Sequence, residues 1–168
     1  MNVHLRVEAE SMLGGRFVVR QDRQEVARLR LKWRDRGEIV IDGVPLEVTN
    51  KGFCSTSWQL RVGGRVVGTA RKRAFSGRRA EVDYFGDVFT LRIAGFFSRK
   101  WELRRGSRTL GAMRPASLWT RSLEAEFDAE VAVQLRMFAL FLVLVLRRRA
   151  SRSGGAGGGG GGAGAVSV

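Results

Sequence analysis

The sequence predicts a mainly β fold, a closed barrel of about twelve antiparallel strands around one central apolar helix near the C-terminus. Three observations predict it. A stretch that opens with an aromatic residue recurs three times, apolar and polar residues alternate within each stretch, and a continuous apolar segment follows the last one. The barrel domain is expected over residues 1–150 and its helix at about 130–149, and the Gly-rich tail at 151–168 is expected to be disordered.

The recurring stretch is recognised by its first residue and by a small residue ten positions later. The opening aromatic residues are Phe17, Trp58 and Trp101. The small residues are Ala27, Gly68 and Gly111. The aromatic residues are 41 and then 43 positions apart, and a period of this length indicates repeated structural units within one fold.

Each unit is predicted to contain about four short strands. Apolar residues occupy every second position, as in Trp58-x-Leu60-x-Val62, which is the period of a half-buried strand. Turn residues separate the strands at Asp22-Arg23, Asp42-Gly43, Gly63-Gly64, Phe85-Gly86-Asp87 and Gly106-Ser107. Many short strands at even spacing are typical of a barrel or a sandwich.

The segment Val131–Leu146 is predicted to be a helix inside the barrel. Its residues are all apolar from Met137 onward, and a helix that is apolar on every side must be surrounded on every side. Sixteen helical residues span about 24 Å, roughly the length of a seven-residue strand. A membrane span needs about twenty apolar residues, and Arg136 interrupts the segment, so no transmembrane span is expected. A C-terminal membrane anchor flanked by Arg147–Arg149 and an internal strand are the alternatives.

The charge of the chain points to an anionic partner. The formal net charge is +14 and the isoelectric point about 11.6, which favours nucleic acid, an anionic membrane surface or polyphosphate. Arginine greatly outnumbers lysine, and a GC-rich coding sequence can also produce that excess. The chain is expected to be cytoplasmic, because Met1–Leu13 lacks the apolar region of a signal peptide. Peripheral association with the membrane is compatible with this location.

The sequence offers little for catalysis or metal binding. Cys54 and His4 are the only residues of their types, so an internal disulfide is impossible and a zinc site built from His and Cys is nearly excluded. His4 is expected in a flexible N-terminal segment, and Cys54 in a linking segment. We therefore expect no enzyme activity, no cofactor and no metal.

One basic loop is the best candidate for a binding site. Its cations surround Phe75, so an apolar residue lies among positive charges, a combination that suits an anionic bilayer surface. The candidate anion- or lipid-binding residues are Arg71, Lys72, Arg73, Phe75, Arg78 and Arg79. The same loop could bind nucleic-acid phosphates without sequence specificity, or be a solvated hairpin tip. Phe96-Phe97 beside Arg99-Lys100 is a second, weaker candidate.

The internal repetition and the closing helix resemble the tubby C-terminal-like superfold, which includes the LURP-one-related proteins and the phospholipid scramblases. The resemblance covers Leu5–Arg149, and its recurring pieces are Arg65–Lys72, Trp101–Gly106 and the helix. It implies a closed barrel of about twelve strands around a central helix. It also implies phosphoinositide or anionic-lipid binding, as in the tubby branch, or lipid movement, as in the scramblase branch. The tubby phosphoinositide site has no residue-by-residue match here, and the scramblase calcium and cysteine-rich segments have no counterpart.

These inferences lead to one functional hypothesis and two alternatives. The hypothesis is a non-enzymatic tubby/LURP-one-like barrel that associates peripherally with anionic phospholipid through basic loops. The first alternative is a nonspecific nucleic-acid-binding module that uses the same arginines. The second is a structural or partner-binding scaffold.

Overall fold

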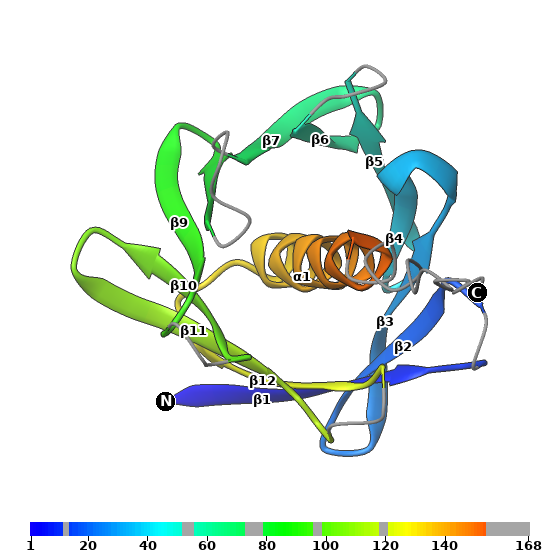
Figure 1. Cartoon of the computed structure of the whole chain (residues 1–168), viewed down its shortest axis with the longest axis horizontal. Coiled ribbons are helices and arrows are strands. Elements are labelled where there is room, and N and C mark those ends of the chain that lie inside the picture. The colour runs from blue at the N-terminus through cyan, green and yellow to red at the C-terminus, as the bar shows by residue number, and fades with distance from the viewer. Residues whose placement is uncertain (12–13, 52–55, 73–78, 96–98, 118–120, 154–168) are drawn as a thin grey trace, which may run out of the picture.

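The fold is a closed antiparallel barrel with a single helix inside it, as the sequence predicts (Figure 1). The computed structural model describes residues 1–11, 14–51, 56–72, 79–95, 99–117 and 121–153. The strands are β1 (Asn2–Ala9), β2 (Arg16–Gln21), β3 (Gln24–Leu31), β4 (Gly37–Ile41), β5 (Val44–Asn50), β6 (Ser57–Val62), β7 (Arg65–Lys72), β8 (Arg79–Tyr84), β9 (Asp87–Ile93), β10 (Trp101–Arg105), β11 (Arg108–Pro115) and β12 (Leu123–Asp128). A short 3-10 helix, η1 (Trp33–Asp35), joins β3 to β4, and α1 (Val133–Ser153) follows β12.

The three repeated stretches of the sequence occupy equivalent places in the barrel. Their aromatic residues begin or nearly begin β2, β6 and β10, and all three are buried against the helix side of the sheet. The small residues lie on β3, β7 and β11, opposite the residues two positions after the aromatic ones, which are Val19, Leu60 and Leu103. In each pair the register shifts at the same place, after Val19, Leu60 and Leu103. A bulge increases local twist and curvature, so a repeated bulge helps the sheet to close.

Strand β1 completes the third unit. It pairs with β12 from Asn2 opposite Asp128 to Val7 opposite Leu123, and with β2 on its other side. His4 therefore lies in a paired strand opposite Glu126, and the expectation that it belongs to a flexible segment is wrong. The alternation of Leu5 and Val7 with polar residues explains this placement, because it buries one face of β1.

Helix α1 fills the barrel and is buried on all sides along most of its length. Every residue from Leu135 to Leu146 is buried, which removes the apolar segment from water as the sequence predicts. The helix packs mainly against β3 and β4. Gly37 permits this approach, since a Cβ atom there would lie 2.4 Å from the Phe141 ring.

The helix extends further than expected, to Ser153 instead of about 149. The last turns are made of arginines, Ala150 and serines, and arginine and alanine have high helix propensity. The Ser151 hydroxyl also donates to the carbonyl of Arg147 at 2.8 Å. Residues 154–168 lie outside the described part of the chain.

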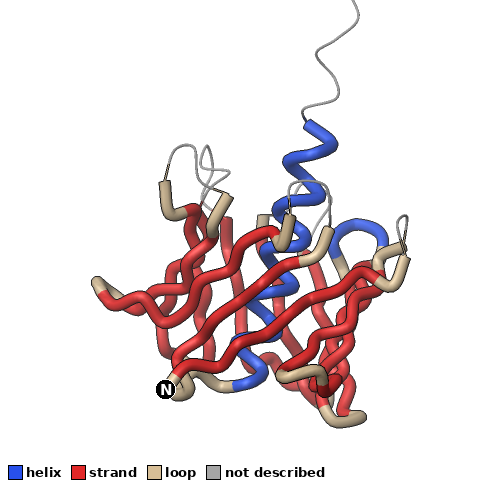
Figure 2. Tube along the Cα trace, turned by 90° about the horizontal axis from the view of Figure 1, so that it is seen from below, coloured by secondary structure: helices blue, strands red, loops and turns tan. Residues whose placement is uncertain are grey.

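The barrel has two different ends, which Figure 2 shows from the side. At one end, two-residue turns join β2 to β3, β4 to β5, β6 to β7, β8 to β9 and β10 to β11, and α1 begins there. We call it the turn end. At the other end lie the longer connections and the C-terminal part of α1. We call it the long-loop end.

Candidate anion-binding end of the barrel

Positive charge is concentrated at the long-loop end. Among the described residues of its connections, of the one strand residue on either side of each connection and of α1 from Arg147 onward, the only carboxylates are Glu10 and Asp35. The cations in the same set are Arg16, Lys32, Arg34, Arg36, Lys51, Lys72, Arg79, Arg99, Lys100, Arg121, Arg147, Arg148, Arg149 and Arg152. One position further into β4 and β10, Glu38 lies 4.0 Å from Lys32 and Glu102 lies 3.9 Å from Lys100.

The turn end carries a balanced charge. Counted in the same way over the described residues, its cations are Arg23, Arg65, Arg105 and Arg108, and its carboxylates are Asp22, Asp42, Asp87, Asp128 and Glu130. The excess positive charge of the protein therefore produces a strong field at one end of the barrel and almost none at the other.

The candidate loop predicted from the sequence joins β7 to β8 at the long-loop end. Arg71 and Lys72 end β7 and Arg79 begins β8, and the side chains of Arg71 and Arg79 are exposed. Arg71 lies opposite Glu81 in the register of the two strands, so a carboxylate is close to its positive charge. Arg73, Phe75 and Arg78 lie outside the described residues.

A second group of cations belongs to the C-terminal part of α1 itself. Arg148 Nη2 donates to Asp35 Oδ1 at 2.8 Å, and Arg149 Nε donates to Asp35 Oδ2 at 2.5 Å. Asp35 is 7 % exposed and has a positive φ of 56°, a conformation that aspartate tolerates better than most residues. The guanidinium of Arg149 also lies over the Trp58 ring, 4.9 Å from its centroid. These contacts fix the end of the helix against the β3–β4 connection.

A pocket of about 340 Å³ lies beside this part of the helix. Its helix side is formed by residues that share one face of α1 because they are three or four positions apart. These are Leu144, Arg147, Arg148, Ser151 and Arg152. Phe17 of β2 and Arg121, which precedes β12, complete the lining. We call this the helix-end pocket.

Three of the four arginines in the helix-end pocket are held by protein partners. Arg148 bonds to Asp35. Arg121 Nη1 donates to the Gly14 carbonyl at 2.9 Å, and its guanidinium lies 5.5 Å from the centre of the Phe17 ring. The Arg152 guanidinium lies 5.8 Å from the centre of the Trp33 ring. These contacts fix the positions of three guanidinium groups whose residues line the pocket.

Arg147 differs from these three. No carboxylate among the described residues lies within ion-pair distance of its half-buried guanidinium. Loss of hydration lowers the pKa of Arg147, and the like charges of Arg99 and Arg121 lower it further. The group remains protonated at neutral pH, so the free protein holds an uncompensated cation in a partly buried place.

One large aromatic side chain is exposed among these cations. Trp33 in η1 is 75 % exposed and lies between Lys32 and Arg34 in the sequence. The other large exposed apolar residues of the described chain lie at the turn end: Met1, Val44, Val66, Phe85, Val88 and Val133. Only the long-loop end therefore combines exposed tryptophan with concentrated positive charge.

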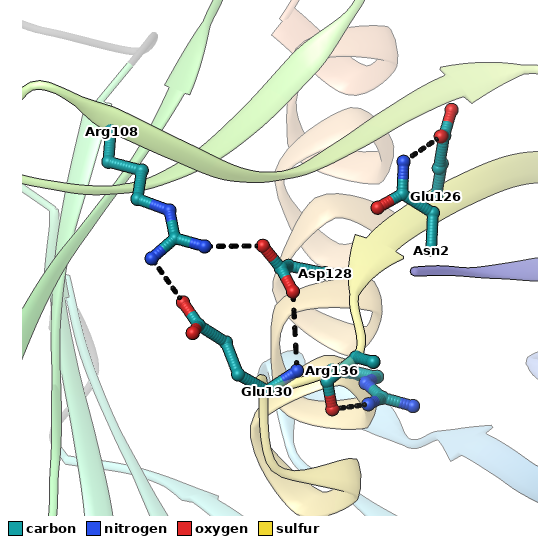
Figure 3. A network of polar contacts seen from close by, with 7 residues as sticks. Asn2, Arg108, Glu126, Asp128, Glu130 and Arg136 are labelled. Atoms are coloured by element: carbon teal, nitrogen blue, oxygen red, sulfur yellow. Dashed lines mark hydrogen bonds and ion pairs between the residues drawn. The ribbon is translucent and has the colours of Figure 1, made fainter.

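A polar network closes the turn end around the start of the helix (Figure 3). Arg108 bridges Asp128 at 2.6 Å and Glu130 at 2.8 Å, and Asp128 Oδ1 accepts the backbone N–H of Glu130. That backbone hydrogen bond and the Arg108 guanidinium lower the pKa of Asp128. Arg136, which is buried, donates to the Ala129 carbonyl at 2.8 Å. The charged side chains of this network therefore hold the start of α1 against the ends of β11 and β12.

A groove of about 750 Å³ runs along the outer face of β1, β11 and β12 and includes His4. Its charges are largely paired with one another, as in Arg20–Glu8 and Arg114–Glu124, so it lacks the excess charge of the long-loop end. In the described part of the chain, no three His, Cys, Asp or Glu side chains are arranged to hold a metal ion. No helix in that part is both long and apolar enough to cross a bilayer.

Sequence reasoning found the basic character of the chain but not the helix-end pocket. The pattern of Leu144, Arg147, Arg148, Ser151 and Arg152 on one helical face is a signal that could have suggested it. Phe17 and Arg121 come from distant parts of the chain, and no local pattern links them to that face. No protein-family model and no curated protein sequence matches this chain.

Proposed function

We propose that this protein is a non-enzymatic, tubby/LURP-one-like barrel that docks on anionic phospholipid membranes with its long-loop end toward the bilayer. The concentration of cations at that end is the observation that carries the proposal. A cation near an anionic membrane surface contributes about 1 kcal/mol. Several of the cations acting together are therefore sufficient for stable peripheral association.

The position of Trp33 favours a membrane surface over nucleic acid. Tryptophan is enriched at the level of lipid headgroups because its ring is apolar and its N–H is polar. Here it is exposed at the end of the barrel where the cations are gathered around the rim. A ring of charge around one end of a barrel suits a broad planar surface.

The turn end makes the docking directional. It also exposes apolar side chains, including Phe85 and Val88, but its carboxylates outnumber its arginines among the described residues. Anionic lipid repels carboxylates. The protein is therefore expected to bind in one orientation, with the start of α1 away from the bilayer.

The test is sedimentation with vesicles of phosphatidylcholine alone and with vesicles that also contain phosphatidylserine. Binding should require phosphatidylserine and should weaken as salt is added, since screening reduces the attraction. The fluorescence of Trp33 should shift to shorter wavelength in the bound state, measured against a Trp33→Phe variant.

A pair of double variants tests the orientation. Arg36→Glu with Arg79→Glu reverses two exposed charges at the long-loop end, and Arg23→Glu with Arg65→Glu reverses two exposed charges at the turn end. The first pair should reduce vesicle binding at least tenfold, and the second should leave it nearly unchanged. Equal binding to both vesicle types would refute the proposal. Tight binding to DNA or RNA at matched salt, with no vesicle binding, would favour a nucleic-acid-binding protein.

A further inference from the structure

The helix-end pocket contains more positive charge than its own side chains neutralise. Its described lining includes four arginines and no carboxylate, and Asp35, which bonds to Arg148, is shared with Arg149. Buried or partly buried charges normally have a partner. In this pocket the described residues leave Arg147 without a carboxylate partner, which indicates that an anion from outside the protein completes the site.

The arrangement of the pocket suits a compact anion with several acceptor oxygens. The lining includes three arginines of the helix (Arg147, Arg148 and Arg152) and one arginine from the connection that precedes β12 (Arg121). Arginine presents its N–H groups in a planar fork that matches phosphate oxygens. A phosphate monoester carries close to two negative charges at neutral pH and three strong acceptor oxygens, whereas a phosphodiester carries one charge.

We propose that the helix-end pocket binds a phosphate monoester group. The group would lie between Arg147 and Arg121, with Arg148 and Arg152 at the edge of the pocket. Phe17 and Leu144 form the apolar part of the lining. If the phosphate belongs to a lipid headgroup, this site rests on the proposed function. Binding of phosphate itself can be tested in solution without vesicles.

The structure makes an unusual prediction for the Arg147→Gln variant. Removing a poorly hydrated cation from beside other arginines should stabilise the free protein, while it removes a ligand for phosphate. A purely structural arginine would show the opposite effect on stability. Sites that bind ligands commonly sacrifice stability in this way.

The first experiment measures thermal unfolding in chloride and in inorganic phosphate at equal ionic strength, together with the phosphate Kd by calorimetry. Phosphate should raise the Tm of the wild-type protein, because a ligand that binds only the folded state stabilises it. Arg147→Gln should raise the Tm in chloride, weaken phosphate binding at least tenfold and abolish the phosphate-dependent shift. Arg65→Gln makes the same charge change at the turn end, where the side chain is exposed, and should behave as wild type.

The second experiment distinguishes a lipid headgroup from a soluble phosphate ester. Vesicles containing phosphatidic acid, a monoester, are compared with phosphatidylglycerol vesicles of equal surface charge. A several-fold preference for phosphatidic acid that Arg147→Gln removes supports a lipid ligand. Phosphate binding without that preference supports a soluble phosphate ester.

The inference and the proposed function can fail separately. An unchanged phosphate Kd in Arg147→Gln, or an equal loss in Arg65→Gln, would overturn the phosphate site even if anionic vesicles still bind. Phosphate binding that depends on Arg147, with no vesicle binding of any kind, would overturn the membrane docking and leave the phosphate site in place.

Discussion

At the scale of single residues, the tight turns show how backbone geometry selects side chains. Four of the two-residue hairpin turns, those after β2, β4, β6 and β8, place both of their residues at positive φ. The second residue is glycine at Gly43, Gly64 and Gly86, but in the β2–β3 turn it is Arg23, with a φ of 73°. A residue with a Cβ atom is strained in this conformation by about 1–2 kcal/mol.

We therefore expect Arg23→Gly to stabilise the protein. Relief of the strain should exceed the entropy that glycine adds to the unfolded chain, so the free energy of unfolding should rise by about 1 kcal/mol. Urea denaturation measures the change. Arg23→Ala removes the same charge but keeps the Cβ atom, and it should give no gain. An equal gain in both variants would attribute the effect to the side chain of Arg23 and not to its φ.

The same residues show which parts of the structure local sequence could predict. Asp42-Gly43 and Gly63-Gly64 predict turns because the conformational preferences of two neighbouring residues are sufficient to define a turn. Trp58 predicts a strand because apolar and polar residues alternate in the stretch that it opens. The contacts of Asp35 with Arg148 and Arg149 join residues more than a hundred positions apart. They exist only because the barrel closes around the helix, so the charge of the helix end was visible in the sequence but its partners and its pocket were not.

At the scale of elements, α1 is held at both of its ends as well as by its apolar surface. Asp35 of η1 accepts hydrogen bonds from arginines in the last turns of α1. The ion pairs of Arg108 lie beside the start of α1 (Figure 3). Apolar packing is not directional and does not fix how far the helix slides along the barrel. The polar contacts at the two ends define that position.

Replacing Asp35 should weaken the attachment at the long-loop end. Asp35→Asn keeps the shape of the side chain and its tolerance of positive φ, but removes the charge that neutralises Arg148 and Arg149. Breaking a buried ion pair typically costs about 3 kcal/mol, and the free energy of unfolding should fall by that order. Urea denaturation checks it, with Asp42→Asn in an exposed turn as the matched control. A stability equal to that of the control would show that the two ion pairs contribute nothing.

The attachment at the turn end should depend on pH. The pKa of Asp128 is lowered in the folded protein, chiefly by the backbone N–H of Glu130 and then by Arg108. Its ionised form thus favours folding at pH values above the ordinary pKa of 3.8, and this contribution is lost as the pH falls through the lowered pKa. Asp128→Asn should be less stable than wild type at pH 7, and the difference in Tm should shrink toward zero below pH 3.8. A difference that stays constant down to the most acidic condition would contradict this explanation.

At the scale of the whole molecule, the barrel consists of three four-stranded units, and the last one is completed by the first strand of the chain. The units are β2–β5, β6–β9 and β10–β12 with β1. In the first two units a tight turn joins the third strand to the fourth. In the third unit the chain leaves β12 at that place and enters the barrel as α1, while β1 takes the position of the fourth strand. The repeat in the sequence predicted the units, but the register that brings β1 beside β12 had no local signal.

Because β1 joins the first unit to the last, its loss should open the barrel. Deleting residues 1–10 would leave β2 and β12 with unpaired backbone N–H and C=O groups and would uncover part of α1, and exposed strand edges associate with one another. We expect the shortened protein to form dimers and larger species in size-exclusion chromatography with light scattering, and we expect the full chain to be a monomer at the same concentration. Deleting residues 154–168 should leave the monomer intact.

A synthetic peptide of residues 1–11 provides the decisive comparison, since it can restore the missing strand in trans. It should convert the shortened protein back to a monomer and restore the wild-type Tm. A peptide in which Leu5 and Val7, the buried residues of β1, are replaced by Asp should fail, because the strand could then no longer face the core. A shortened protein that remains monomeric and as stable as the full chain would mean that the other strands close without β1, and the assignment of β1 to the third unit would be wrong.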